Sequence, residues 1–302
     1  MIDLRQIQAL IAVAEEGSVA RAAIRLGWSQ PTVDYHLKNL DRLAGIPLTT
    51  RSSRGSQLTA PGHLMRERGE EILNLADRAL TDVRDLAAVG RTKVRFGTFP
   101  TAAARLLPGI AALLGNRGIE IDTTLAEVPN LVEQVNRREL DAALLYRIPG
   151  FEVPFRADVR SLHVLTDPLL LALPATHPLA AAESIDEADL PQLASERWVL
   201  GSTPGDAVDE IVREVVGAGR SLAIAVRSDD YAVVLGLIAA GMGVALIPSL
   251  MRASPPEGVV LRPINSARFT RELVLAAPAP KGADAPIMHL SEAVRRAIHD
   301  LD

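Results

Sequence analysis

Hydroxyl side chains gather where two predicted strands end, and these residues are the best placed in the sequence to bind a small molecule. Residues 98–102 follow one apolar strand and open a helix, and residues 201–204 follow another such strand. Ligands of parallel sheets bind beyond the carboxyl ends of the strands, where helix N-termini attract anions. If the two turns face one another, they predict a cleft that favours a carboxylate or another small anion. The predicted cleft residues are Thr98, Pro100, Thr101, Ala102, Tyr146, Ser202, Thr203 and Ser228.

Each of these hydroxyls is also explained as an ordinary helix cap, and it is the set at opposed strand ends that favours a site. Neither turn contains a basic residue, and Arg147 and Arg227 are the nearest cations in the sequence. A neutral or weakly anionic ligand is therefore as open as a carboxylate.

Patterns for catalysis and for metal binding are missing from the sequence. The six histidines are scattered, with no two at a metal-ligand spacing, and there is no cysteine. Thiolate metal sites, cysteine nucleophiles and disulfides are therefore excluded, and no phosphate loop, dinucleotide-binding glycine pattern or nucleophile elbow is present. Asp229 and Asp230 are adjacent carboxylates, which more often cap a helix than perform acid–base chemistry. We expect no enzyme activity, no metal and no cofactor.

The elements that position the two turns alternate between strand and helix beyond residue 92. Strands are expected at 94–98, 119–125, 142–146, 198–200, 223–226, 244–248, 259–263 and 273–277, and helices at 101–114, 131–137, 206–216, 231–240 and 286–301. This rhythm predicts a mainly parallel sheet that is covered by helices.

The first sixty residues predict a winged helix-turn-helix. Gly17 ends a first amphipathic helix, Ser18 can cap a second, and Gly27 ends that one. Ser29 then caps a third helix that runs to about residue 44. This geometry places a second helix in the major groove of DNA. The residues expected to meet base edges or phosphates are Gln30, Pro31, Thr32, Asp34, Tyr35 and Lys38.

Residues 46–59 predict a short hairpin, the wing, that turns near residue 54. Arg51 and Arg54 lie beside hydroxyl residues and are expected to grip phosphate. The chain has a net charge of −5, yet its first 66 residues carry eight Lys and Arg against five Asp and Glu. A mildly basic head on an acidic body fits a DNA-binding module. The alternative is a bundle of three small helices with solvated surface arginines.

One long helix is predicted from residue 60 to about residue 89. Its apolar residues repeat at intervals of seven, which is typical of a short coiled-coil seam. The residues of this seam are Met65, Ile72, Ala79 and Leu86, with Leu75 and Val83 between them. The pattern favours dimerisation over packing of the helix on its own domain, and residues 90–92 are a predicted hinge.

Taken in order, these features resemble the LysR-type transcriptional regulators. The resemblance is carried by Gly17-Ser18, Arg21-Ala22-Ala23, Ser29-Gln30-Pro31-Thr32-Val33, Leu58-Thr59-Ala60-Pro61-Gly62, and by Gly241 and Gly243 before a strand that ends in Pro248. The family usually has a small hydroxyl residue where Asp34 stands, so the operator of a relative does not carry over to this chain.

The resemblance implies an α/β fold class with three parts. A winged helix-turn-helix occupies residues 1–60, a linker and dimerisation helix residues 61–90, and a two-lobed effector domain like the periplasmic binding proteins residues 91–302. The chain is expected to cross between the lobes near 162–166 and 265–269. Lobe one is then 91–163 with 268–302, and lobe two is 164–267.

We therefore expect a sequence-specific, DNA-binding transcription regulator controlled by a small-molecule effector between the lobes. The expected partners are double-stranded DNA, the effector, and further copies of the chain in a homodimer or homotetramer. A DNA-binding regulator without a ligand and a solute-binding protein are the alternatives, and the helix-turn-helix and the lack of an export signal argue against the second. The most apolar stretch, 169–174, is too short to span a bilayer, so we expect a cytoplasmic protein without membrane contact.

Overall fold

The computed structural model describes residues 1–52, 55–89, 92–217, 221–252, 255–279 and 285–301 of the 302-residue chain. It divides into two compact units. The first comprises residues 1–93 together with 133–140, and the second comprises residues 94–132 and 141–302. Within the described ranges, no helix combines the length and the apolarity that crossing a membrane requires.

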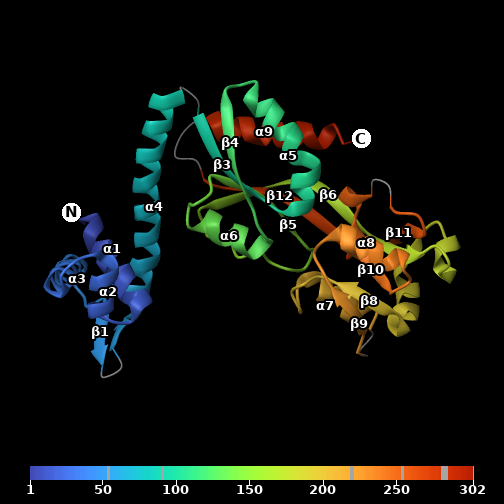
Figure 1. Ribbon diagram of the computed structural model, residues 1–302, viewed down its shortest axis with the longest axis horizontal. Helices are drawn as coiled ribbons and strands as arrows, with labels where there is room; N and C mark the ends of the chain where they lie inside the picture. The colour runs from blue at the N-terminus through green and yellow to red at the C-terminus, as the bar shows by residue number, and fades with distance from the viewer. Residues whose placement is uncertain (53–54, 90–91, 218–220, 253–254, 280–284, 302) are drawn as a thin grey trace. The chain divides into compact units, whose positions relative to one another are not determined.

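The first unit is the predicted winged helix-turn-helix followed by a long helix (Figure 1). Its elements are α1 (Leu4–Glu16), α2 (Val19–Leu26), α3 (Gln30–Ala44), β1 (Thr49–Ser52), β2 (Gly55–Leu58) and α4 (Ala60–Val89). Strands β1 and β2 pair antiparallel and form the wing. The apolar faces of the helices bury Leu10, Val33 and Leu40 almost completely, so the helical periodicity of the sequence forms one small core.

The ends of these helices follow from single residues. Gly17 and Gly27 both adopt left-handed backbone conformations (φ 61° and 66°) where α1 and α2 end, which glycine does at least cost. The Ser29 hydroxyl accepts a hydrogen bond from the Thr32 N–H at 3.2 Å and caps α3 as predicted. Ser18 stands directly before α2 at its N-cap, but its side chain makes no capping hydrogen bond, and only its carbonyl accepts from the Ala22 N–H.

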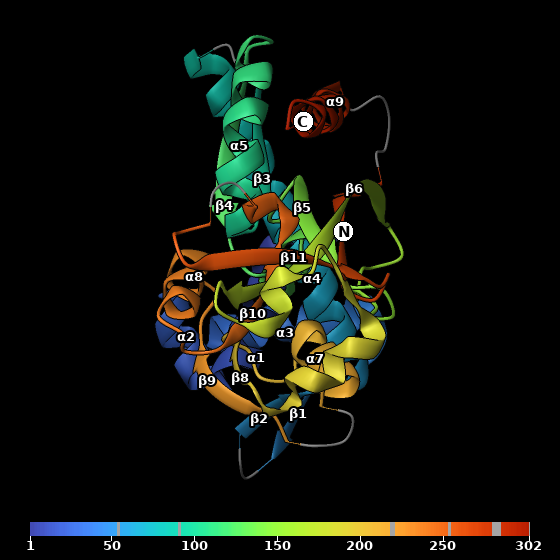
Figure 2. The ribbon, with the colours of Figure 1, turned by 90° about the vertical axis from the view of Figure 1, so that its right-hand side faces the viewer.

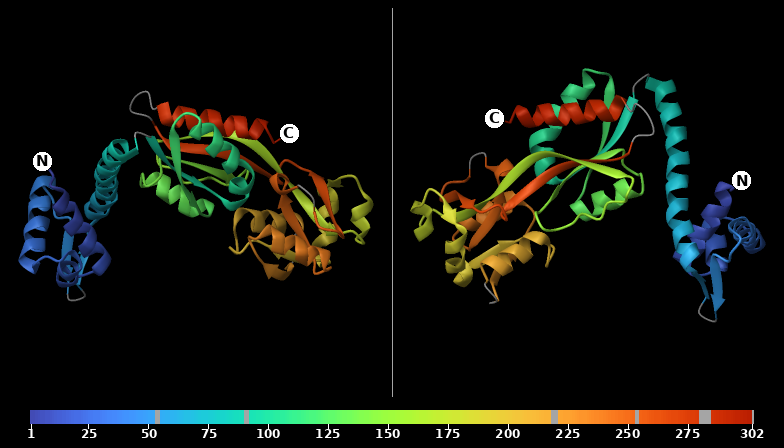
Figure 3. Two further views of the ribbon diagram at one scale, coloured as in Figure 1. Left: turned by 45° about the horizontal axis from the view of Figure 1, so that its top comes forward. Right: turned by 180° about the vertical axis from the view of Figure 1, so that it is seen from behind.

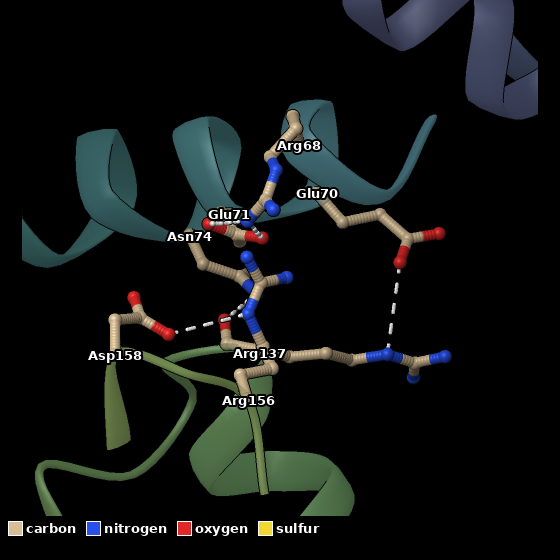
Figure 4. A network of polar contacts seen from close by, with 7 residues as sticks. All are labelled: Arg68, Glu70, Glu71, Asn74, Arg137, Arg156 and Asp158. Atoms are coloured by element: carbon tan, nitrogen blue, oxygen red, sulfur yellow. Dashed lines mark hydrogen bonds and ion pairs between the residues drawn. The ribbon is translucent and has the colours of Figure 1, made fainter. Parts of the chain in front are cut away.

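Helix α4 packs along α1, and glycine permits the close approach. A Cβ atom at Gly69 would lie 2.5 Å from Cγ2 of Ile7, and one at Gly62 would lie 2.0 Å from the backbone oxygen of Leu48. Further along, α4 meets the segment 133–140 of the same unit (Figure 4). There, Nδ2 of Asn74 donates to the Arg137 carbonyl at 3.0 Å.

The second unit is built on a ten-stranded sheet with the order β4-β3-β5-β12-β6-β10-β8-β9, and β11 and β7 pair beside this path. The strands are β3 (Thr92–Thr98), β4 (Ile119–Leu125), β5 (Ala142–Arg147), β6 (Val159–Pro174), β7 (Ile185–Asp186), β8 (Arg197–Leu200), β9 (Ala223–Arg227), β10 (Val244–Pro248), β11 (Val259–Asn265) and β12 (Thr270–Pro278). We use the name lobe one for the β3–β5 half and lobe two for the β8–β10 half.

Strand β6 belongs to both halves of the sheet. Its residues up to Pro168 pair with β12, and its residues from Leu169 pair with β10 and β11. The change of partner therefore falls just after residues 162–166, and residues 266–269 join β11 to β12. Residues 159–168 form a strand that the sequence did not predict, because their polar and apolar residues do not follow a clear alternation.

Helices cover both faces of the lobe-two strands. Trp198 and Leu200 of β8 pack with Ile211 of α7 (Ala207–Val215) on one face. Val199, between them, packs with Ile238 of α8 (Tyr231–Ala239) on the other. Figure 2 shows α7 and α8 on different sides of these strands. Two short 3₁₀ segments, η1 (Pro178–Ala181) and η2 (Glu187–Ser195), complete this side of the lobe, with η3 (Ser249–Met251) after β10.

In lobe one, α5 (Pro100–Gly115) and α6 (Val128–Asn136) accompany β3 to β5, and α9 (Ala285–His299) runs beside α5 (Figure 3). The two helices approach closely at Gly109, where a Cβ atom would lie 3.4 Å from that of Ala297. Helix α5 begins two residues after β3 ends, so its N-terminus lies at the carboxyl end of that strand.

Candidate functional site

One face of α3 carries the residues that the sequence assigned to DNA. Gln30, Pro31, Tyr35 and Lys38 are exposed, and the Tyr35 side chain is the most open of the large apolar ones on this helix at 64%. Thr32 and Asp34 are half-buried on the same side. Because Val33, Leu37 and Leu40 fill the core from the opposite face, α3 presents a polar and aromatic surface of a size that fits the major groove.

A buried histidine lies behind this surface, and sequence reasoning gave it no place there. His36 is only 6% exposed, and its ring lies 5.2 Å from that of Trp28 and 5.5 Å from that of Tyr35. The three rings join the turn before α3 to the helix itself. The sequence did contain a signal for this ring contact, because Trp28 lies in the turn before α3 and His36, eight residues later, lies in α3.

The wing leans on the turn between α1 and α2. The Ser56 N–H donates to the Gly17 carbonyl at 2.9 Å. Gly55 has φ 118°, and a Cβ atom there would lie 2.3 Å from the same carbonyl oxygen, so glycine is required. Arg51 lies in β1, but its side chain, like Arg54 as a whole, falls outside the described residues. Their role toward phosphate stays a prediction.

In lobe one, the turn from β3 into α5 is buried. Thr98, Thr101 and Ala102 are 1%, 7% and 1% exposed, whereas Pro100 is exposed. Oγ1 of Thr98 is buried and has no hydrogen-bond partner among the described residues. An unpaired buried hydroxyl costs free energy, and such groups concentrate at sites where a ligand or water completes the bonding.

A buried arginine, Arg271, lies against this turn. It stands on β12 opposite Asp167 of β6, and its Nε and Nη2 both donate to Oδ2 of Asp167, at 3.1 and 2.6 Å. Nη2 also reaches Oγ1 of Thr101 at 3.4 Å. The other carboxylate oxygen of Asp167 accepts from the Ser249 hydroxyl at 2.7 Å and from the Leu250 N–H at 3.0 Å. This one ion pair thus links strands β6 and β12 both to the turn from β3 into α5 in lobe one and to η3 in lobe two.

Aromatic rings enclose the same guanidinium. The Arg271 carbon Cζ lies 5.3 Å from the centre of the Phe99 ring and 4.8 Å from that of Tyr146, which favours cation–π attraction. The two rings meet edge to face at 5.1 Å. Burial raises the pKa of Tyr146 and of Tyr231, so both phenols stay protonated and can donate a hydrogen bond.

The lobe-two turn presents carboxylates. The Ser202 N–H donates to Oδ1 of Asp229 at 3.0 Å, and the Ser202 hydroxyl contacts the other oxygen. Oδ1 of Asp206 accepts from the Asp209 N–H at 2.7 Å. A Cβ atom on Gly201 would lie 3.0 Å from Oδ2 of Asp206 and 3.3 Å from Oδ1 of Asp229, so both carboxylates converge on this glycine.

Two other hydroxyls of the predicted set lie around this turn. Thr203 is exposed, and its carbonyl accepts from the Asp206 N–H. The Ser228 hydroxyl accepts from the Asp230 N–H at 3.1 Å. Asp230 itself caps α8, as the sequence predicted for this carboxylate pair.

The cations that are nearest in sequence are engaged elsewhere. Nε of Arg147 pairs with Glu272 at 2.6 Å, and Arg227 donates to the Gly201 carbonyl at 2.8 Å and pairs with Asp209. The cation at the lobe-one turn is instead Arg271, which stands 170 residues from Thr101. The available signal was a pair of charged residues, Asp167 and Arg271, each separated by one residue from an apolar strand segment.

The two turns influence one another electrostatically. Glu127 lies between β4 and α6, and it is an exposed residue whose carboxyl group is partly buried. This partial burial raises the pKa of Glu127, and the charges of Asp229 and Asp206 raise it further. Arg271 acts in the opposite direction. Burial is also the main cause that raises the pKa of Asp206. Carboxylates of both lobes therefore share one electrostatic environment with Arg271.

Other regions offer less. The described residues contain no group of three His, Asp or Glu side chains that could hold a metal ion. A surface hollow of about 160 Å³ lies between α5 and α9, and its charged side chains Arg117, His289 and Glu292 already contact one another.

Comparison with known proteins agrees with this architecture. Residues 87–298 match the family described as "LysR substrate binding domain", and residues 4–63 match "Bacterial regulatory helix-turn-helix protein, lysR family". The "Small neutral protease regulatory protein" of Streptomyces coelicolor is 30% identical over 97% of this chain and 87% of its own. The "Hca operon transcriptional activator HcaR" of Escherichia coli is 29% identical over 87% of each chain.

Solved structures share the fold along the whole chain. Full-length CbnR in complex with its target DNA is 24% identical with a TM-score of 0.61, over 98% of this chain and 99% of that one. Full-length OxyR of Pseudomonas aeruginosa is 23% identical with a TM-score of 0.62, over 98% and 95%. The helix-turn-helix, the α/β domain and these matches together show that the chain belongs to the LysR-type transcriptional regulators, as a DNA-binding regulator with an effector-binding domain.

Proposed function

We propose that the effector binds between the two lobes, at the turns that carry Thr98, Thr101 and Ser202, and that Arg271 is its principal anchor. The observation that carries this proposal is the buried guanidinium, which contacts the N-terminal turn of α5 while its ion-pair partner contacts η3 of the other lobe. A ligand at this position contacts Arg271, whose ion pair with Asp167 links β12 to β6. The helix N-terminus and Arg271 together favour an anionic group on the ligand.

In this mechanism, the effector changes the relative stability of two arrangements of the lobes. A ligand can shift such an equilibrium only by the difference between its affinities for the two states. Contacts that span the cleft supply that difference, because they form fully in one arrangement. The altered lobe angle then changes the spacing of the DNA-binding heads in the assembled regulator.

We propose that α4 is the dimer interface of a homodimer or homotetramer, and that residues 61–90 form a separate linker between the head and the residues 91–302. Support comes from an apolar stripe on α4 at Ile72, Leu75 and Val83, which are 38%, 54% and 68% exposed. Met65, which was also assigned to the seam, packs against the core of its own head. The Leu86 side chain falls outside the described residues.

The effector site is tested by the melting temperature of the full chain against a panel of small organic acids, amino acids and aromatic metabolites. A saturating ligand at about a hundred times its Kd adds roughly 2.7 kcal/mol of stability. We expect one chemical class to raise the melting temperature, and Thr101→Val to abolish that rise. Thr123→Val, on β4 away from the turn, is the matched control. A rise that survives Thr101→Val would place the ligand elsewhere.

The DNA face is tested with a duplex that the wild-type protein selects from a random-sequence library. Gln30→Ala removes a base-edge contact and is expected to weaken specific binding by about 1–3 kcal/mol. Lys38→Ala is expected to weaken binding to all sequences and to lower the salt slope by about 1, because one phosphate contact is lost. Arg160→Ala, an exposed arginine on β6, controls for overall charge. Unchanged affinity in both α3 variants would disprove this recognition face.

A further inference from the structure

We propose that the effector is an amino carboxylate, with its anionic group at Arg271 and its ammonium group between Glu127, Asp206 and Asp229. This inference rests on the proposed effector site and adds the chemical class of the ligand. The inference follows from the opposite charges on the two sides of the site. The lobe-one side has the buried Arg271, whose guanidinium is not fully hydrogen-bonded, and the lobe-two side has carboxylates that form no ion pair within the described residues.

The anion-binding half consists of polar groups that the protein leaves incomplete. The guanidinium of Arg271 is 3% exposed, and its hydrogen bonds leave from Nε and Nη2. Among the described residues, nothing accepts a hydrogen bond from Nη1. The Thr98 hydroxyl of the same turn is 1% exposed and also lacks a partner. The free Nη1 of this arginine and the buried, unpaired hydroxyl of Thr98, beside the N-terminus of the 16-residue helix α5, fit a carboxylate.

The lobe-two half cannot accept a second anion. The Ser202 N–H of this turn already donates to Asp229. The groups that remain for a ligand are carboxylate oxygens, which accept hydrogen bonds and repel an anion. Asp206 and Asp229 reach the two sides of Gly201. Glu127 of lobe one lies within their electrostatic reach. None of these three carboxylates forms an ion pair with any residue in the described ranges, whereas Asp209 nearby is paired by Arg213 and Arg227.

The mutual repulsion of these carboxylates has a physical consequence. Burial is the main cause that raises the pKa of both Glu127 and Asp206, and neighbouring acids raise both further, whereas backbone hydrogen bonds from Asp209 and Val208 lower that of Asp206. Arg271 lowers the pKa of Glu127, and Asp209 raises that of Asp206. Tyr146 and Tyr231, which both stay neutral, lie within the electrostatic reach of the same carboxylates. A cation placed between the carboxylates relieves this repulsion and gains charge-assisted hydrogen bonds.

A ligand with both charges is therefore favoured over a ligand with one. A dicarboxylate satisfies Arg271 but brings a second negative charge to the acidic side. A simple amine leaves the unsatisfied groups at Arg271 and Thr98 unchanged. An amino carboxylate completes both sides and spans the cleft, which is also the arrangement that holds the lobes in one relative position.

The test uses titration calorimetry of the full chain with four matched series. The amino carboxylates are the common α-amino acids and the glycine, β-alanine, 4-aminobutyrate and 5-aminovalerate series. The other three series are the corresponding monocarboxylates, amines and dicarboxylates. We expect one amino carboxylate to bind at least tenfold more tightly than its monocarboxylate and its amine, because a charge-assisted hydrogen bond is lost in each.

Two variants locate each charge. Glu127→Gln keeps the shape and is expected to weaken the amino carboxylate roughly tenfold or more while leaving the monocarboxylate unchanged. Glu120→Gln, exposed at the start of β4, is the control. The affinity of the wild-type protein for the amino carboxylate is expected to fall as the pH is lowered, because protonation removes the negative charges that hold the ammonium group. The fall is expected to start above the usual carboxyl range, because the pKa values of Glu127 and Asp206 are raised, and to be shallower in Glu127→Gln.

The outcomes separate the two proposals. Tighter binding of a monocarboxylate or dicarboxylate, lost in Thr101→Val, would overturn the amino carboxylate and leave the effector site standing. Binding of an amino carboxylate that ignores both Glu127→Gln and Thr101→Val would overturn both. The absence of binding across all four series would overturn the amino carboxylate, and the melting-temperature panel would then decide on the effector site.

Discussion

Asp167→Asn is expected to lower the free energy of unfolding of the effector-binding domain by about 3 kcal/mol, because it leaves Arg271 charged and buried without its partner. Asp167 is completely buried and Arg271 is 3% exposed, so water cannot replace the lost carboxylate. The asparagine retains an oxygen that can accept from the Leu250 N–H. The change therefore reports on the ion pair more than on the turn after β10.

The measurement is urea unfolding, followed by the fluorescence of Trp198, which lies in the core of lobe two. The double variant Asp167→Asn with Arg271→Gln removes both charges and is the matched control. It is expected to recover most of the loss, since the cost comes from the unpaired ion. If the single variant is as stable as the wild-type protein, the ion pair does not hold the two crossing strands together.

Gly62→Ala is expected to destabilise the DNA-binding head by about 2 kcal/mol, because the added methyl group has no space. A Cβ atom would lie 2.0 Å from the Leu48 carbonyl oxygen and 3.3 Å from Cβ of Leu58. The two nearest atoms, the carbonyl oxygen and carbon of Leu48, are backbone, so α4 itself must move away from the wing. The Thr59 hydroxyl, which accepts from the Gly62 N–H at 3.1 Å, would lose this capping bond as well.

Thermal unfolding monitored by circular dichroism measures this change, and DNA affinity is expected to fall with it. Gly236→Ala is the matched control, because Gly236 also lies in a helix but has nothing within 4 Å of the added Cβ atom. That substitution is expected to stabilise the chain by about 0.4–1 kcal/mol. Equal effects of the two substitutions would mean that helix propensity, and not the contact with Leu48, governs position 62.

Local signals predicted most of the fold. Helix α4 runs over the predicted residues 60–89, and α3 ends at Ala44 as expected, because caps, glycines and apolar periodicity act within a few residues. The segment between Pro178 and Ser195 was not predicted. It consists of short 3₁₀ turns around a two-residue strand, and such turns have too little periodicity to leave a pattern.

The candidate site shows where sequence reasoning reaches its limit. The hydroxyls at Thr98 and Ser202 could be proposed from the sequence because strand ends and helix starts are local features. Arg271 was missed because its meeting with Thr101 depends on the pairing of β6 with β12. The carboxylates were also missed as a group, since Asp229 comes to Ser202 across 27 residues. Long-range strand pairing decides these contacts, and no local pattern encodes it.

The continuity of β6 determines how the effector-binding domain can deform. One strand of 16 residues is hydrogen-bonded to β12 in its first part and to β10 and β11 in its second. Motion between the lobes must therefore twist or bend a hydrogen-bonded sheet, and no loose tether is present on this strand to swing freely. A sheet that is deformed in this way resists large rotations, and it returns to its original shape when the deforming force is removed. The domain is thus suited to small, reversible rotations.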